Sequence, residues 1–169
     1  MSRAMFLLVL SLLSAAPPPA PAPARAPASQ RVVTLFLPGS DGGLTTQMAG
    51  VRREAVLEKE IKSVLDILSA EWERAAFAPP KSAKVQTVFI DAQKTVYLAY
   101  NEEITARHPG GITMEIASAA SICKTVMTNY DVDGVRFLQK GRELKTLAGH
   151  VDVGSKITRA KCDNMASFR

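Results

Sequence analysis

A chain of 169 residues, 47% hydrophobic and 22% charged, has the length and composition of one soluble globular domain with some residues to spare. These proportions exclude a collagen-like chain, a wholly disordered chain and a multi-span membrane protein. Residues 31–157 hold 16 basic and 15 acidic side chains, so their charge is +1 out of a total of +5, and the ends carry the rest. A nucleic-acid module gathers its charge on one face, and the near-neutral middle argues against a nucleic-acid partner.

Residues 1–16 have the layout of a secretory signal peptide. Arg3 gives a positive start, residues 5–13 (MFLLVLSLL) are apolar, and small residues follow at 14–16. A membrane-spanning helix needs about 20 apolar residues, so we expect no stable membrane anchor, although an uncleaved signal anchor is an alternative. The sequence therefore predicts an exported protein that works in the periplasm or outside the cytoplasmic membrane.

Residues 17–30 form a Pro/Ala-rich linker that contains six prolines between Pro17 and Pro27. Proline fixes its own backbone and lacks an N–H donor, so this stretch favours an extended polyproline II conformation. We interpret it as a semi-rigid spacer between the export signal and the folded domain.

The next elements follow from hydrophobic periodicity. Residues 32–37 (VVTLFL) predict a buried strand, ended by Pro38 and Gly39. Residues 44–51 are ambiguous and leave room for a short second strand. Residues 54–72 place apolar side chains at steps of three and four, which predicts an amphipathic helix.

The second half of the domain is predicted to contain further strands and a second helix. Residues 85–90 and 95–100 predict a hairpin, 112–130 a second amphipathic helix, and 135–139 with 143–147 a final strand pair. The order β-α-β-β-α-β-β predicts an α+β two-layer domain over 31–157, with two helices packed on one face of a mixed, mostly antiparallel sheet. Residues 158–169 are expected to form a C-terminal tail.

Few side chains point to chemistry. His108 and His150 lie 42 residues apart, without the short spacing of a zinc site, so we expect neither a metal nor another cofactor. His150 and Asp152 could share one side of a strand, but closeness in sequence is poor evidence for a catalytic set. Adjacent Glu102 and Glu103 point apart and are poor partners for acid–base catalysis. We interpret His150 as a structural residue that ties a loop to backbone groups.

The two cysteines, Cys123 and Cys162, allow two interpretations. In an exported chain they invite a disulfide. Cys123 also falls on the apolar face of the second helix, where it would serve as a small buried hydrophobic residue.

Four segments resemble the GerMN domain, the sporulation and spore germination domain of bacterial envelope proteins. They are VVTLFLPGSDGG at 32–43, VQTVFIDAQKTVYLAYNEEI at 85–104, RHPGG at 107–111 and GVRFLQKGRELKTLAGHVDVGSKI at 134–157. The resemblance implies an exported, non-catalytic module near the cell wall, similar in build to the ring-building domains of sporulation complexes. Its signature positions, which we interpret as structural, are His108, Gly110, Gly111, Gly149, His150 and Asp152.

The sheet face turned away from the helices is the expected partner surface. Alternation along the strands leaves Thr and aromatic side chains on one row, with Phe36, Phe89 and Tyr97 as its large members. An exposed patch of this kind usually marks an interaction site. The alternative is that the loop at 38–50 or the tail covers it.

The sequence therefore predicts a non-enzymatic domain of the cell envelope that acts in protein–protein binding or assembly. Its partner would be an envelope protein, a cell-wall component or a second copy of itself. The alternative functions are a peptidoglycan-binding module and a wall hydrolase that uses His150 and Asp152.

Overall fold

The computed structural model describes residues 29–75 and 78–168, so the predicted signal peptide at 1–16 and nearly all of the predicted linker lie outside the described residues. The strands are β1 (Gln30–Pro38), β2 (Leu44–Arg52), β3 (Val85–Ile90), β4 (Thr95–Tyr100), β5 (Gly134–Gln139), β6 (Arg142–Glu143) and β7 (Ile157–Thr158). The helices are α1 (Leu57–Glu71), α2 (Glu103–Ala106), α3 (Ile112–Asn129) and α4 (Arg159–Ala166), with a 3-10 turn, η1 (Trp72–Arg74), after α1.

The strands belong to two sheets. β1 and β2 form an antiparallel ribbon of two nine-residue strands. The other five form a mixed sheet in the order β3-β4-β5-β6, with β7 also paired to β5. β4 and β5 run parallel because α3 carries the chain back between them, and the remaining pairs are antiparallel.

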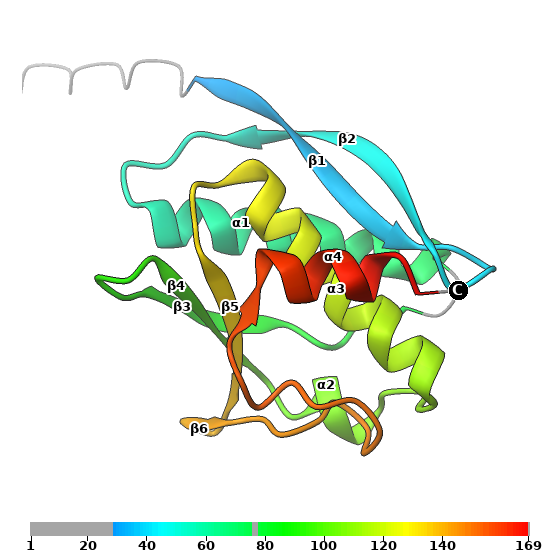
Figure 1. Ribbon diagram of the computed structural model, residues 1–169. Helices are drawn as coiled ribbons and strands as arrows, with labels where there is room; N and C mark the ends of the chain where they lie inside the picture. The colour runs from blue at the N-terminus through cyan, green and yellow to red at the C-terminus, as the bar shows by residue number, and fades with distance from the viewer. Residues whose placement is uncertain (1–28, 76–77, 169) are drawn as a thin grey trace, which may run out of the picture.

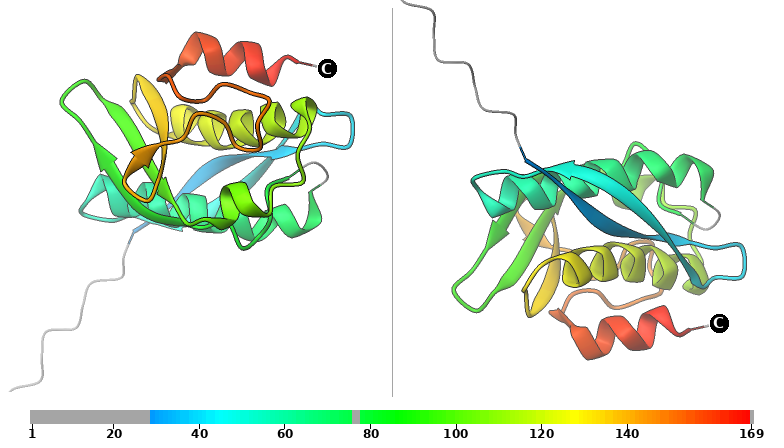
Figure 2. Two further views of the ribbon diagram at one scale, coloured as in Figure 1. Left: turned by 90° about the horizontal axis from the view of Figure 1, so that it is seen from below. Right: turned by 90° about the horizontal axis from the view of Figure 1, so that it is seen from above.

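Helices α1 and α3 lie between the two sheets (Figure 1). Seen from above, the ribbon crosses over both helices (Figure 2). The predicted α1 stripe is buried at Ile61, Val64, Leu65 and Leu68. It meets Val33 and Leu35 of β1 and Val85 and Val88 of β3 in one continuous core.

The α+β class and the mixed sheet are thus confirmed, while the layers differ from the expectation of two. The strand predicted at 32–37 does not join the main sheet, because its neighbour is the full-length strand β2 at 44–52. The strand predicted at 143–147 shortens to β6, which pairs only two residues with β5. Residues 144–156 instead form a loop that returns to β7.

Side chains of α3 close the other edge of β1. The Asn129 amide accepts from the Thr34 N–H at 2.9 Å and donates to the Thr34 carbonyl at 2.7 Å. One and two turns earlier, Thr125 accepts from the Phe36 N–H and Ser121 donates to the Phe36 carbonyl. These polar residues at four-residue spacing replace a neighbouring strand and satisfy backbone groups that an open edge would expose.

The fold continues past residue 157, where we expected the domain to end. Helix α4 packs against α3 (Figure 2), and Cys162 and Met165 are part of the core. The Thr158 hydroxyl caps α4 by accepting from the Lys161 N–H. Residues 158–166 therefore form an integral element of the domain.

Candidate functional site

The predicted HPGG turn positions His108 against the start of α3. Gly110 and Gly111 both have positive φ angles, 83° and 85°, a conformation that other residues adopt only with strain. The Gly110 N–H donates to Nδ1 of His108 at 3.1 Å, which leaves the proton on Nε2, and Nε2 lies 3.0 Å from the Ser118 hydroxyl. Burial lowers the pKa of His108, and the nearby carboxylate of Glu115 opposes this shift only in part. The imidazole is therefore held neutral near pH 7.

Glu115, one turn into α3, is the residue that the sequence reasoning missed. Its side chain is fully buried, and it accepts the backbone N–H of His150 at 3.0 Å and that of Val151 at 3.1 Å. The Nδ1–H of His150 donates to the same carboxylate at 2.6 Å. Burial alone would raise the pKa of Glu115, but hydrogen bonds from Ala148, His150 and Val151 outweigh it and lower that pKa. The sequence signal that could have identified Glu115 is a carboxylate on a helix face with mostly apolar neighbours.

We call this arrangement the α3 clasp: His108, Ser118, Glu115, His150 and Val151. It brings two separate signature segments, RHPGG and AGHVD, onto the first turns of one helix. The polar groups of His108, Ser118 and Glu115 have protein partners, whereas the His150 side chain, 47% exposed, bonds the described residues through Nδ1 alone. The arrangement can hold a loop, and His108, with its proton on Nε2, donates to the Ser118 hydroxyl instead of accepting its proton.

The other catalytic candidates are not paired in the structure. The Asp152 carboxylate accepts the Gly154 N–H at 2.8 Å, while His150 has Glu115 as its carboxylate partner. Glu102 bonds Lys140 at 2.7 Å and Glu103 bonds Arg107 at 2.8 Å, in two separate ion pairs.

Gly149, the remaining signature position, shapes the loop. It has a φ of 104°, and its N–H donates to the Thr146 hydroxyl at 3.0 Å. This turn points the next residue, His150, toward Glu115.

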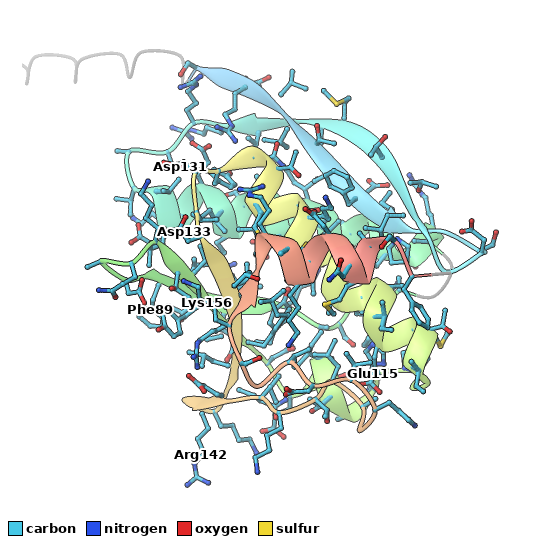
Figure 3. The ribbon with its side chains drawn as sticks, in the orientation of Figure 1. Phe89, Glu115, Asp131, Asp133, Arg142 and Lys156 are labelled. Atoms are coloured by element: carbon cyan, nitrogen blue, oxygen red, sulfur yellow. The ribbon has the colours of Figure 1, made fainter. Side chains whose placement is uncertain are left out.

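The outer face of the five-stranded sheet carries an exposed aromatic patch. The register pairs Phe89 with Tyr97 and Tyr97 with Arg136, so these three side chains form one row across β3, β4 and β5. Phe89 is 55% exposed, Tyr97 and Arg136 are partly exposed, and Figure 3 shows Phe89 far from Glu115. We call this row the outer-face patch.

Phe36 does not belong to this patch, contrary to the expected grouping. It lies on β1, in the other sheet, where Thr46 of β2 is its register partner. The two segments that could have covered the patch, the loop at 38–50 and the C-terminal tail, lie elsewhere. Residues 44–52 pair with β1, and the tail forms α4, which packs on α3.

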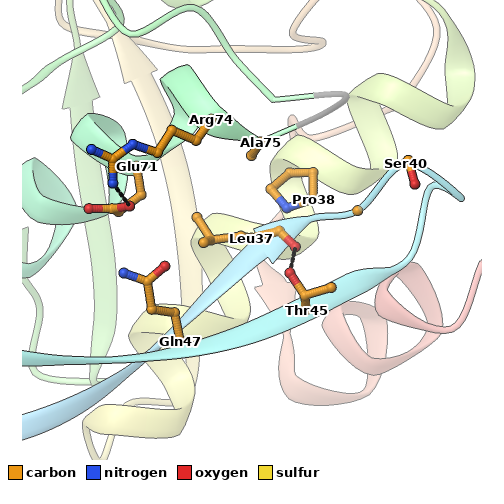
Figure 4. Close-up of a pocket in the computed structure, with 9 residues that line it drawn as sticks. Leu37, Pro38, Ser40, Thr45, Gln47, Glu71, Arg74 and Ala75 are labelled. Atoms are coloured by element: carbon orange, nitrogen blue, oxygen red, sulfur yellow. Dashed lines mark hydrogen bonds and ion pairs between the residues drawn. The ribbon is translucent and has the colours of Figure 1, made fainter.

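A cavity of about 450 Å³ opens near the turn between β1 and β2, between Pro38, Gln47 and the end of α1 (Figure 4). Its lining mixes Leu37 with the ion pair of Glu71 and Arg74, and it contains no histidine or cysteine. None of the predicted site residues lines it. Among residues 29–75 and 78–168, no cluster of three His, Cys, Asp or Glu side chains could hold a metal ion.

The two cysteines are free and buried. Both belong to the same buried core and lie on helices that pack against each other, Cys123 on α3 and Cys162 on α4. Within the described part of the chain, no helix is both long and apolar enough to cross a bilayer.

Comparisons with family models and with curated proteins give no match to this sequence. Solved structures do match. The first GerMN domain of the sporulation protein GerM from Bacillus subtilis superposes with a TM-score of 0.58 at 16% identity, over 77% of this chain and 98% of that one. The chain has a GerMN-like fold.

Two further structures agree with this assignment. The tandem GerMN domains of the same Bacillus protein match with a TM-score of 0.57 at 18% identity, over 78% of this chain and 47% of theirs. A candidate lipoprotein from Clostridium perfringens matches with a TM-score of 0.56 at 14% identity, over 83% of this chain and 97% of that one. The resemblance drawn from the four sequence segments is thus confirmed at the level of the fold.

Proposed function

We propose that this protein is an exported, non-enzymatic domain of the bacterial cell envelope, and that it assembles with a second copy of the same fold. The observation that carries the proposal is the outer-face patch. A 55% exposed phenylalanine beside a tyrosine and an arginine has the composition that protein interfaces favour. Phe89 is the anchor that such an interface would bury.

A partner with the same fold is supported by the similar Bacillus protein, in which two GerMN domains occur in tandem in one chain. The charges of the patch also suit an antiparallel copy. Arg136 lies next to Glu143 of β6, and the two form an ion pair. In a contact between two copies related by a two-fold axis, Arg136 of each copy could pair with Glu143 of the other. A two-fold contact of this kind uses the same patch on both partners.

Export is supported by residues 1–30, with their short apolar run and proline-rich spacer. An envelope location agrees with the sporulation protein and the candidate lipoprotein among the similar structures. Fractionation of cells that express the full chain tests this part. Recovery of the full-length protein from the cytoplasm alone would refute it.

The absence of a reaction is supported by the contacts of the candidate residues. His150 and Asp152 bond different groups, and His108, the imidazole beside the Ser118 hydroxyl, carries its proton on the nitrogen that faces that hydroxyl. The remaining alternative is glycan binding, because exposed aromatic side chains beside the Asp91 carboxylate could stack on sugar rings. The experiment below separates this alternative from self-assembly.

The assembly test compares Phe89→Lys with Met48→Lys. Met48 is 65% exposed on the ribbon, so both variants add a charge at an exposed apolar site and should keep the fold. We expect light scattering to show concentration-dependent association of the wild type and Met48→Lys, and a monomer for Phe89→Lys. A wild type that stays monomeric at millimolar concentration would refute self-assembly. Wall fragments that capture the wild type and lose Phe89→Lys would favour glycan binding instead.

A further inference from the structure

Two thiols meet where α4 packs on α3. Cys123 and Cys162 are the chain's two cysteines, and both are buried in one core, each on one of the two packed helices. Contacts on both sides fix this alignment. Lys124 forms an ion pair with Asp163, and the Arg159 guanidinium donates to the Met127 carbonyl at 3.1 Å. The helices are thus aligned antiparallel, and this register places Cys123 and Cys162, the residues just before Lys124 and Asp163, at the same level of the helix pair.

We propose that Cys123 and Cys162 form an intramolecular disulfide that fastens α4 to α3 in an oxidising compartment. Disulfide geometry is specific and excludes cysteines that are held apart, but these two are buried at the same level of a packed helix pair. Disulfides persist in exported proteins and are rare in the cytosol. The place where the bond forms in the cell rests on the proposed export, while the ability of the pair to form it rests on its placement in the helix pair alone.

Cys162 is the thiol that reacts first, because it lies on the terminal helix α4 and becomes accessible when that helix opens, whereas Cys123 lies in the middle of α3. The neighbouring Cys123 side chain lowers the pKa of Cys162, and the positive charge of Lys124 acts in the same direction. Burial raises the pKa of Cys123, so this thiol is the later of the two to react.

The reaction is a thiol–disulfide exchange with an external disulfide, such as oxidised glutathione. The Cys162 thiolate attacks one sulfur of that disulfide, forms a mixed disulfide and releases one thiolate. The Cys123 thiolate then attacks the Cys162 sulfur and releases the second thiolate. Two protein thiols are oxidised by two electrons, and the two protons they lose end on the two released thiols.

An external disulfide reaches the buried pair when α4 opens. This eight-residue helix is the last element of the fold, and terminal elements open at lower free energy than the core. Met165 is the other buried apolar side chain that α4 contributes to the core. Met165→Ala should therefore speed bond formation, because it weakens the docking of α4 without touching either thiol.

The experiment treats the purified full chain with oxidised glutathione or with dithiothreitol. Titration of free thiols after denaturation should fall from two to none in oxidised wild type, with a mass loss of about 2 Da and no dimer. The bond closes a segment of 39 residues (162 − 123), so we expect a melting temperature roughly 10 °C higher in the oxidised form. Cys162→Ser should show no such change, and Met165→Ala should oxidise several times faster.

The comparison of two redox states of the wild type needs no variant to fold. Two thiols that stay titratable after prolonged oxidation would overturn the proposal, and so would a bond that forms only between two chains. An unchanged oxidation rate in Met165→Ala would overturn the route through α4 opening. None of these results depends on where the protein lies in the cell, so they are distinguishable from a failure of export.

Discussion

The α3 clasp can be tested by replacing Glu115 with glutamine. The buried carboxylate accepts two hydrogen bonds from His150 on Oε1 and one from the Val151 N–H on Oε2. Glutamine has the same shape but only one acceptor oxygen. Its amide nitrogen must therefore face a donor, either at His150 or at Val151.

The expected cost follows from these contacts. A hydrogen bond to a charged group contributes about 1.5–3 kcal/mol, and a buried donor without a partner costs about 1–3 kcal/mol. Water reaches the partly exposed His150 side and offsets some of this loss. We expect Glu115→Gln to lower the free energy of unfolding by about 3 kcal/mol, which lowers the melting temperature of a chain of this size by about 10 °C.

The assay is urea unfolding with calorimetry, and the matched control is Glu73→Gln. Glu73 is exposed and bonds Lys81 at the surface, so its variant should unfold like the wild type. His150→Ala should lie between the two, because it removes one side-chain donor and keeps the backbone one. The reasoning would be refuted if Glu115→Gln unfolded at the same urea concentration as Glu73→Gln.

The same carboxylate gives a pH dependence with a fixed sign. The pKa of Glu115 is lower in the fold than its ordinary value of 4.5, so its contribution is complete above that value. It is lost as the pH falls through the lowered pKa. The acid-unfolding curve of Glu115→Gln should therefore be shallower below about pH 4.5 than that of the wild type.

Two further substitutions test other contacts. Burial lowers the pKa of His108 below 6.5, so the free energy of unfolding of the wild type should fall as the pH drops below that value. His108→Asn should lose this part of the dependence of stability on pH between pH 7 and pH 5, and identical slopes in the two proteins would contradict the prediction. Asn129→Ala leaves the Thr34 N–H and carbonyl without their side-chain partners and should lower the free energy of unfolding in urea by about 2 kcal/mol. The control Thr128→Ala, at an exposed position, should change it by almost nothing. Equal effects of the two variants would show that the Asn129 amide does not stabilise the edge of β1.

The parts of the fold that the sequence predicts are those with a local signal. The stripe of α1 and the alternation of β3 and β4 record which face is buried, and Asp91 with Lys94 marks the turn between the strands. These features depend on residues close together in the chain. Pattern reasoning therefore placed them within a few residues of their observed bounds.

The parts that it missed depend on distant partners. Most of β2 is exposed, so its residues carry no apolar alternation, and only pairing with β1 makes it a strand. Helix α4 is mostly polar and is held by its contacts with α3. Glu115 becomes interpretable only when the loop at 148–151, more than 30 residues away, is placed against it. The local sequence of these elements does not indicate which distant segment of the chain they contact.

The strongest signature residues of this chain are therefore poor guides to its function. His108 and His150 stand in the segments that most resemble the GerMN domain, and each bonds a side chain of α3. Because these bonds hold two loops against α3, substitution of either histidine is expected to change stability first. Phe89 has the opposite character, because it is exposed and contributes little to the core. A loss of assembly without a loss of stability in Phe89→Lys would separate the surface that acts from the clasp that holds the fold.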